Sequence, residues 1–154
     1  MKVTSATADP RLEGVRHQVV DTGPVKSLEE AAQLRGVQPS SVIKTLVVRR
    51  SEDAYLFVLV PGDRVIDWPK LRSALGERRL SMPDADEAFD VTGYKRGTIT
   101  PFGASRDWPV YADQRLADGD VSIGGGAHGI SITIAGADLL RVVDAQVEDL
   151  TKAE

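Results

Sequence analysis

The stretch VSIGGGAHGISITI, residues 121–134, predicts two short strands joined by a glycine-rich turn. After the turn, Ile130, Ile132 and Ile134 alternate with Ser131 and Thr133, which is the period-two pattern of a half-buried strand. Glycines at 124, 125, 126 and 129 permit backbone conformations that other residues resist, and they let another molecule approach the main chain closely. Two interpretations follow: a hairpin with a loose tip, or a pocket wall made of bare backbone.

Working outward from this hairpin, strands and helices alternate irregularly. Strands are expected at residues 17–20, 42–48, 54–60, 78–83, 108–112 and 145–150, and helices at 27–35, 67–76, 84–90 and 136–143. Since the alternation is broken several times, a doubly wound sheet is disfavoured. We expect an α+β fold whose mixed, mostly antiparallel sheet is curled into a barrel-like core with surrounding helices.

The composition favours one globular domain without metal or disulfide chemistry. The length suits a single domain over residues 1–154, with a loose tail at 1–8. Cysteine is absent, and the two histidines, His17 and His128, show no HExxH-type spacing, so we expect no metal and no cofactor. The N-terminal residues contain no apolar run, which predicts a cytoplasmic protein without a membrane segment.

The charge pattern limits the kind of nucleic-acid partner. A formal charge of −4 argues against a protein that coats long nucleic acid through a uniformly basic face, but it leaves open one that grips only an end. Basic residues still gather in the middle of the chain, at Lys70, Arg72, Arg78, Arg79, Lys95, Arg96 and Arg106. They serve either solubility or a local phosphate-contacting patch.

Lys44 is the first candidate for chemistry, because it interrupts the apolar run VIKTLVV, residues 42–48. It is either a cation on an exposed face or a cation pointed into a cleft, where it would bind a phosphate or carboxylate or stabilise developing negative charge. Thr45 faces the opposite way in a regular strand. His128 is either a hydrogen-bonding group of a site or an ordinary solvent-exposed polar residue. Ser131 lacks the GxSxG context of a nucleophile.

Several motifs together resemble those of the YbaK/prolyl-tRNA-synthetase-associated editing domain family, which hydrolyses mischarged aminoacyl-tRNA. The matching stretches are SLEEAAQLRG (27–36), VIKTLVV (42–48), DWPKLRSALG (67–76), TGY (92–94), GTITPFG (97–103) and residues 121–140. Each motif is weak alone, whereas their order and spacing extend over nearly the whole chain.

The resemblance implies a barrel-like fold and a set of site residues. Lys44 corresponds to the family's active-site lysine, and the backbone of Gly124, Gly125 and Gly126 would face the substrate carbonyl or the terminal ribose. The loop formed by Gly97, Thr98, Ile99, Thr100 and Pro101 would shape the amino-acid pocket. Thr22, Thr45, His128 and Ser131 are further substrate-binding candidates. Ala127-His128 and Ser131 replace the basic pair and the acid of some cysteine-specific members, and Thr22 lies where some members have a tyrosine.

The implied function is that of a trans-acting, metal-independent aminoacyl-tRNA deacylase. It would hydrolyse the ester of a mischarged tRNA carrying a small amino acid, with tRNA(Pro) as one candidate and substrate-assisted catalysis as the mechanism. Its partners would be the acceptor end of tRNA and, as a further candidate, an aminoacyl-tRNA synthetase, with the oligomeric state left open. The alternatives are a non-catalytic module that binds an aminoacyl-tRNA or nucleotide end, and a small-molecule hydrolase or oxidoreductase with a bound cofactor or metal.

Overall fold

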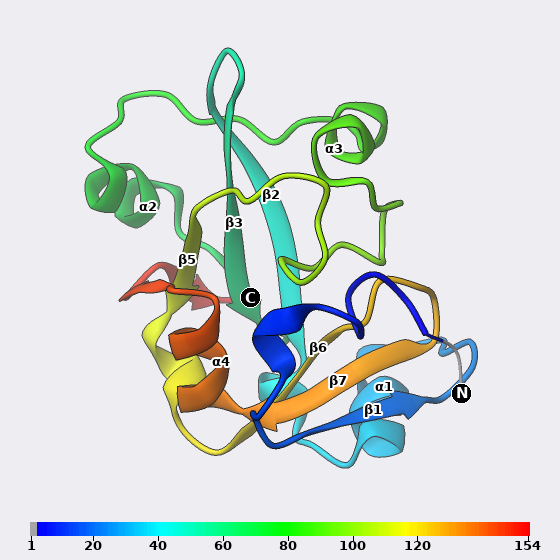
Figure 1. Ribbon diagram of the computed structural model, residues 1–154. Coiled ribbons are helices and arrows are strands. Elements are labelled where there is room, and N and C mark those ends of the chain that lie inside the picture. The colour runs from blue at the N-terminus through cyan, green and yellow to red at the C-terminus, as the bar shows by residue number, and fades with distance from the viewer. Residues whose placement is uncertain (1–2) are drawn as a thin grey trace.

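A computed structural model describes residues 3–154 (Figure 1). The strands in this range are β1 (His17–Asp21), β2 (Ile43–Ser51), β3 (Ala54–Pro61), β4 (Arg64–Ile66), β5 (Val110–Asp113), β6 (Asp120–Gly124), β7 (Ile130–Ala135), β8 (Gln146–Glu148) and β9 (Thr151–Ala153). The α-helices there are α1 (Leu28–Arg35), α2 (Trp68–Leu75), α3 (Ala85–Thr92) and α4 (Gly136–Val142), and the 3₁₀-helices are η1 (Pro10–Leu12), η2 (Pro39–Ser41) and η3 (Gln114–Ala117).

Three separate sheets carry the fold. Their strand orders are β1-β7-β6, β2-β3-β5-β8 and β4-β9, and all pairings are antiparallel except β3 with β5 and β5 with β8. The expected mixed, mostly antiparallel α+β fold is therefore confirmed. The barrel is wrong, because no sheet within residues 3–154 closes on itself. Within residues 3–154, backbone pairing joins the first two sheets only at a parallel bridge between Val42 and Ser122, beyond which β2 and β6 diverge.

The β2–β3 hairpin has two buried faces, each covered by a helix. Residues of one face pack with Ala88 of α3, and residues of the other pack with Leu71 and Leu75 of α2. The first face includes Ile43, Val47, Phe57 and Leu59, and the second includes Val48, Leu56, Val58 and Val60. In Figure 1 the hairpin accordingly rises between the two helices. Burial on both faces explains why Ala54–Val60 is a continuous apolar run instead of an alternating one.

Local capping explains most helix boundaries. The side chains of Ser27, Asp67 and Asp84 accept hydrogen bonds from the backbone N–H three residues ahead, as expected for N-caps. Gly36 and Gly76 end α1 and α2 in the left-handed conformation. These helices agree with the predicted ones.

Three short segments differ from prediction. The expected strand at 78–83 is reduced to a single bridge between Arg49 and Ser81. Strands β4 and β9 were not predicted, since three residues are too few to show an alternating pattern.

The predicted loose tail is wrong for residues 3–8. Ala6 is fully buried in the core, and Thr4 Oγ1 donates a 2.6 Å hydrogen bond to the Gly125 carbonyl. Ser5 Oγ lies 2.9 Å from the Tyr94 hydroxyl, within hydrogen-bonding distance. Residues 3–8 are mostly small, and they show no hydrophobic periodicity from which this packing could be predicted. Met1 and Lys2, the rest of the predicted tail, lie outside the described residues.

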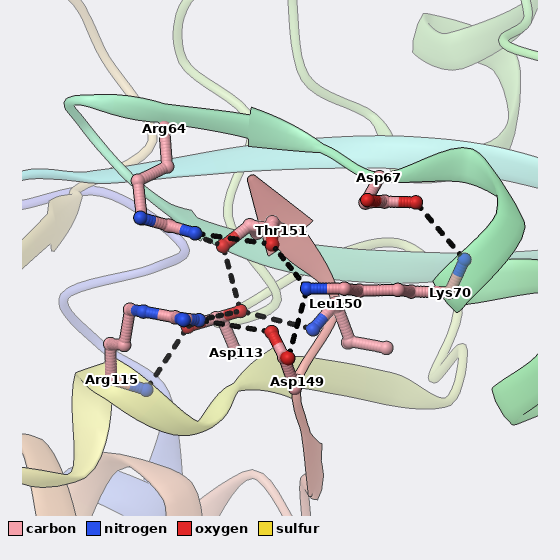
Figure 2. A network of polar contacts seen from close by, with 8 residues as sticks. All are labelled: Arg64, Asp67, Lys70, Asp113, Arg115, Asp149, Leu150 and Thr151. Carbon is pink, nitrogen blue, oxygen red and sulfur yellow. Dashed lines mark hydrogen bonds and ion pairs between the residues drawn. The ribbon is translucent and has the colours of Figure 1, made fainter. Parts of the chain in front are cut away.

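A polar network joins β4, β5 and β9 (Figure 2). At its centre the fully buried Asp113 carboxylate accepts hydrogen bonds from the Leu150 N–H and the Thr151 hydroxyl. Arg64 Nε donates to the same hydroxyl at 2.7 Å, and the Arg64 carbonyl accepts from Lys44 Nζ at 2.5 Å. Burial alone would raise the pKa of Asp113, but hydrogen bonds from Arg115, Leu150 and Thr151 outweigh it, so the pKa lies below its ordinary value.

The depressed pKa of Asp113 predicts a pH-dependent contribution to stability. Asp113→Asn should lower the free energy of unfolding at pH 7 by about 2 to 4 kcal/mol, since an amide group cannot accept all of these donors. The difference from wild type should persist above the ordinary aspartate pKa and shrink as the pH falls through the lower folded-state value. Urea unfolding from pH 7 to pH 3 measures it, with Asp63→Asn, a change at an exposed aspartate, as control. A difference that does not change with pH would contradict the prediction.

The packing of residues 3–8 predicts unequal effects at two glycines with similar backbone conformation. Gly103 has a φ of +64°, and an added Cβ would meet the Ser5 carbonyl oxygen at 2.2 Å, whereas Gly119 has a φ of +68° and open space around it. Gly119→Ala should cost about 1 kcal/mol of stability and Gly103→Ala about 2 to 4 kcal/mol. Thermal unfolding compares them. Equal costs would mean that the N-terminal segment contributes nothing.

Candidate active site

A cavity of about 620 Å³ opens where β2 and β6 diverge. Its walls come from residues 42–47, from residues 82–85 at the start of α3, from the loop containing Gly97 and Ile99, and from Gly124 at the end of β6. Arg35, Ala88 and Arg96 complete the lining. Its volume lies within the range of small-molecule sites.

One wall is the open edge of β2. The Arg49 N–H and C=O both bond to Ser81, on the side of β2 away from β3. Because the peptide groups of a strand alternate in direction, the backbone groups of Thr45 and Val47 point to that same side. Both residues line the cavity. The cavity wall therefore presents main-chain donors and acceptors that the sheet leaves unused.

Gly124 presents a main-chain donor from the opposite wall. The N–H of the next residue, Gly125, donates to the Ile130 carbonyl at 2.8 Å and so points toward β7. Alternation directs the Gly124 N–H to the other edge of β6, where Ser122 bridges to β2. Gly124 also lies close to the Ile99 carbonyl, which an added Cβ would meet at 3.4 Å. The glycine turn and the 97–101 loop are therefore in contact.

Lys44 and Thr45 reach the cavity from opposite faces of β2. Lys44 is paired with Val60, on the face covered by α2, and Thr45 is paired with Leu59, on the other face. Both line the cavity, because it wraps around the edge of the strand. The half-buried Lys44 ammonium donates to the Arg64 carbonyl. Thr45 Oγ1 is buried and has no hydrogen-bond partner among the described residues.

Arg35 is a cavity residue that the sequence interpretation missed. Its guanidinium donates to the buried Ser122 hydroxyl at 3.3 Å, and its buried Nε has no partner within residues 3–154. Burial lowers the pKa of Arg35 below the ordinary arginine value, although the group stays charged near neutral pH. A cation in the last turn before the Gly36 cap is ordinary for a helix, so the sequence carried no signal that singled it out.

The cavity brings together five of the predicted site residues: Lys44, Thr45, Gly97, Ile99 and Gly124. Thr98 and Thr100 do not line it, contrary to prediction. Both are buried; the Thr98 hydroxyl donates to the Lys95 carbonyl, and the Thr100 hydroxyl accepts from the Phe102 N–H. Pro101 is also buried, with its carbonyl bonded to Arg11. The loop thus offers the cavity Gly97 and Ile99, while its threonines stabilise the turn.

The other predicted residues lie outside the lining as well. The Gly125 N–H is already bonded within the hairpin, which removes it as an oxyanion donor, and Gly126 packs against Tyr94 and Ala6. Thr22 bonds through its N–H to Gly129. His128 is exposed and lies over Gly97, where an added Cβ would meet its Cε1 at 3.3 Å.

Ser131 is fully buried directly opposite Gly124, and its hydroxyl has no partner among the described residues. It therefore lies behind the glycine turn, one strand away from the cavity.

The charge of the lining suits an anionic ligand. The lining contains three cations, Arg35, Lys44 and Arg96, and one carboxylate, Asp84, whose Oδ1 accepts the capping hydrogen bond of α3. Within the described part of the chain, no three His, Asp or Glu side chains converge as they would for a metal ion. Likewise, no helix in residues 3–154 has the length and apolarity that a bilayer crossing requires.

Comparison with known proteins identifies the family. The model of the aminoacyl-tRNA editing domain matches residues 22–142, so the chain belongs to this family. The match extends over residues 22–142 and therefore includes every residue that lines the cavity.

Individual relatives agree with this assignment. A putative Cys-tRNA(Pro)/Cys-tRNA(Cys) deacylase of Enterococcus faecalis is 26% identical over 129 residues, which is 83% of this chain and 79% of that protein. A proline--tRNA ligase of Bacillus velezensis is 33% identical over 97 residues, 63% of this chain but only 17% of the ligase. The crystal structure of a putative trans-editing enzyme for prolyl tRNA synthetase superposes with a TM-score of 0.83 at 26% identity, covering 99% of this chain and 100% of the other.

Arg35 is expected to contribute anion affinity to the cavity. Wild-type protein should bind AMP about 10-fold more tightly than adenosine, because the phosphate gains a charge-assisted contact. Arg35→Met should remove most of this preference, and Arg141→Met, which changes an exposed arginine of α4, should retain it. Calorimetric titration measures both affinities. An unchanged AMP preference in Arg35→Met would show that Arg35 does not bind the anion.

Proposed function

We propose that this protein is a trans-acting aminoacyl-tRNA deacylase whose active site is the cavity between β2 and β6. The observation that carries the proposal is the cavity itself: cations and unused strand-edge amides surround it, and it lies within the matched editing domain. Cations suit the phosphates of a tRNA acceptor end, and fixed amides suit an ester carbonyl that gains negative charge during attack.

The reaction is hydrolysis of the ester between an amino acid and the terminal ribose. Water adds to the carbonyl carbon, the bond to the ribose oxygen breaks, and one proton of the water ends on that oxygen. The Gly124 N–H would stabilise the oxyanion, replacing the Gly125 amide that the hairpin uses. Lys44 would hold the terminal phosphate or ribose, and a ribose hydroxyl would orient the water. An aminoacyl ester is already activated, so positioning and electrostatics suffice.

The substrate we favour carries a small amino acid. A terminal nucleoside would take up much of the 620 Å³ cavity, and Ile99 together with the β2 side chains narrows what remains. The relatives named as Cys-tRNA(Pro)/Cys-tRNA(Cys) deacylase and as proline--tRNA ligase make tRNA(Pro) a reasonable first candidate. Residues 1–154 would act as one editing domain in the cytoplasm, where charged tRNA is used, with a synthetase as a candidate partner.

A panel of mischarged tRNAs, varied in both amino acid and tRNA identity, tests the function. Purified protein should release the amino acid from at least one small-residue combination and leave correctly charged tRNA intact. Binding without turnover across the whole panel would instead identify a non-catalytic module.

Lys44→Ala should lower the single-turnover rate on the best substrate of this panel by about 100-fold, because the terminal nucleotide loses its cation contact. Lys26→Ala, which changes an exposed lysine outside the cavity, should have the wild-type rate. Release of radiolabelled amino acid measures both. Unchanged deacylation by Lys44→Ala on every substrate would contradict the assigned role.

A further inference from the structure

The N-terminal segment, residues 3–12, contacts two walls of the cavity without lining it. None of its residues is among those that line the cavity, and all of them precede residues 22–142, the part that the editing-domain model matches. The Thr4 hydroxyl bonds the Gly125 carbonyl of the glycine turn. The charged residues of the segment contact the main chain directly after the 97–101 loop. The segment therefore connects the two loops that approach each other at the cavity.

Asp9 and Arg11 form an ion pair that holds the main chain on both sides of Phe102. Asp9 Oδ2 accepts a 2.8 Å hydrogen bond from the Gly103 N–H, and Arg11 Nη2 donates a 2.9 Å hydrogen bond to the Pro101 carbonyl. The same Arg11 Nη2 lies 2.8 Å from Asp9 Oδ2. The guanidinium carbon of Arg11 lies 5.4 Å from the centroid of the Phe102 ring. We call this pair, with its two main-chain bonds, the Asp9–Arg11 clamp.

Burial makes the clamp a firm contact. Asp9 is only 8% exposed, and Phe102 is fully buried. Burial alone would raise the pKa of Asp9, but hydrogen bonds from Arg11 and from the Gly103 N–H outweigh it, so the pKa lies below its ordinary value. The carboxylate is therefore ionised near neutral pH. Removing one partner of such a pair leaves the other charge without compensation, so the two residues depend on each other.

The clamp lies close to a residue that shapes the cavity. Ile99, which lines the cavity, precedes Pro101 by two residues, and two residues of chain reach at most about 7 Å. On the other side of Ile99, the Thr98 hydroxyl bonds the Lys95 carbonyl at 2.7 Å. The Ile99 carbonyl also lies where an added Cβ on Gly124 would meet it at 3.4 Å. The position of Ile99 is therefore fixed from both of its neighbours along the chain.

We propose that Asp9 and Arg11 are positioning residues that set the size of the amino-acid end of the cavity by holding Ile99 in place. This inference rests on the proposed function and adds to it the residues that enforce the choice of a small amino acid. An apolar wall rejects additional methylene groups only when it does not yield to them. The clamp supplies that resistance from outside the cavity, because it bonds the main chain of the loop and leaves the side chain of Ile99 to contact the substrate.

The test compares hydrolysis of one tRNA charged either with alanine or with leucine. Wild-type protein should have a kcat/KM about 100-fold higher for the alanyl ester. Arg11→Met removes the bonds to Asp9 and Pro101, and it should lower this ratio about 10-fold through faster hydrolysis of the leucyl ester. Arg11→Lys keeps a cation but not the planar fork, so its ratio should lie between those two values. A fall in both rates with an unchanged ratio would show a merely structural role and would overturn the proposal.

A matched control is Arg50→Met, because Arg50 also bonds one acid and one main-chain carbonyl. Its Nε donates to Glu77 at 2.8 Å and its Nη2 donates to the Leu75 carbonyl at 2.9 Å, and it does not line the cavity. This variant should keep the wild-type ratio, since any change in tRNA affinity affects both esters alike. An equal fall of the ratio in Arg50→Met and Arg11→Met would overturn the proposal.

The double variant Asp9→Asn/Arg11→Met tests whether the pair acts as one unit. Its ratio should be no lower than that of Arg11→Met alone, because residues in one network have coupled effects. Independent losses that multiply in the double variant would show that the two residues act separately, and they would overturn the clamp.

Binding of uncleavable analogues separates this inference from the proposed function. The probes are 3′-amino-3′-deoxyadenosine carrying alanine or leucine through an amide bond, and calorimetry measures both affinities. If the wild type hydrolyses no mischarged tRNA, the deacylase assignment fails, and the clamp is then judged on binding alone. Tighter binding of the alanyl analogue by wild type, reduced about 10-fold in Arg11→Met, supports the clamp. An equal preference in both proteins, or no preference in the wild type, overturns it.

Discussion

The divergence of β2 from β6 after their single bridge at Val42 and Ser122 is the constraint on which the site depends. Unpaired strand edges are usually a liability, because their free N–H and C=O groups recruit other strands. In this fold two such edges face each other across a cavity instead of facing bulk solvent. The backbone N–H groups that a closed barrel would use for strand pairing remain available to a ligand.

Main-chain donors stabilise a ligand's charge only when the surrounding residues hold them in a fixed position. The glycine turn is held from behind by Thr4, whose hydroxyl bonds the Gly125 carbonyl, and by Tyr94, which packs on Gly126. The 97–101 loop is stiffened by the inward hydroxyls of its threonines. Rigid placement of this kind is what electrostatic stabilisation of a developing charge needs, because donors that must reorganise lose much of their effect.

The sequence predicted local structure well and spatial relations poorly. Capping side chains and terminal glycines defined α1 and α2, since those signals involve residues a few positions apart. The motif resemblance brought Lys44, Gly97 and Gly124 to one site. An alternating pattern indicates which side chains are buried, but it does not indicate which strand edges lie next to each other. It therefore could not show that β2 and β6 diverge after one bridge, or that the side chains of Thr98 and Thr100 are buried away from the cavity. Arg35 was missed because its importance comes from Ser122, 87 residues away.

The contact between Lys44 and the Arg64 carbonyl also bears on the order in which the molecule is assembled. Arg64 is held by Thr151, which the ribosome adds 87 residues later. At about 5 to 20 residues per second, synthesis of that stretch takes about 4 to 17 seconds. During this interval β2 and β3 can already pair, while the carbonyl that receives the lysine still lacks its anchor. Every residue that lines the cavity therefore precedes β9 in synthesis, and β9 is the strand that pairs with β4 and holds Arg64.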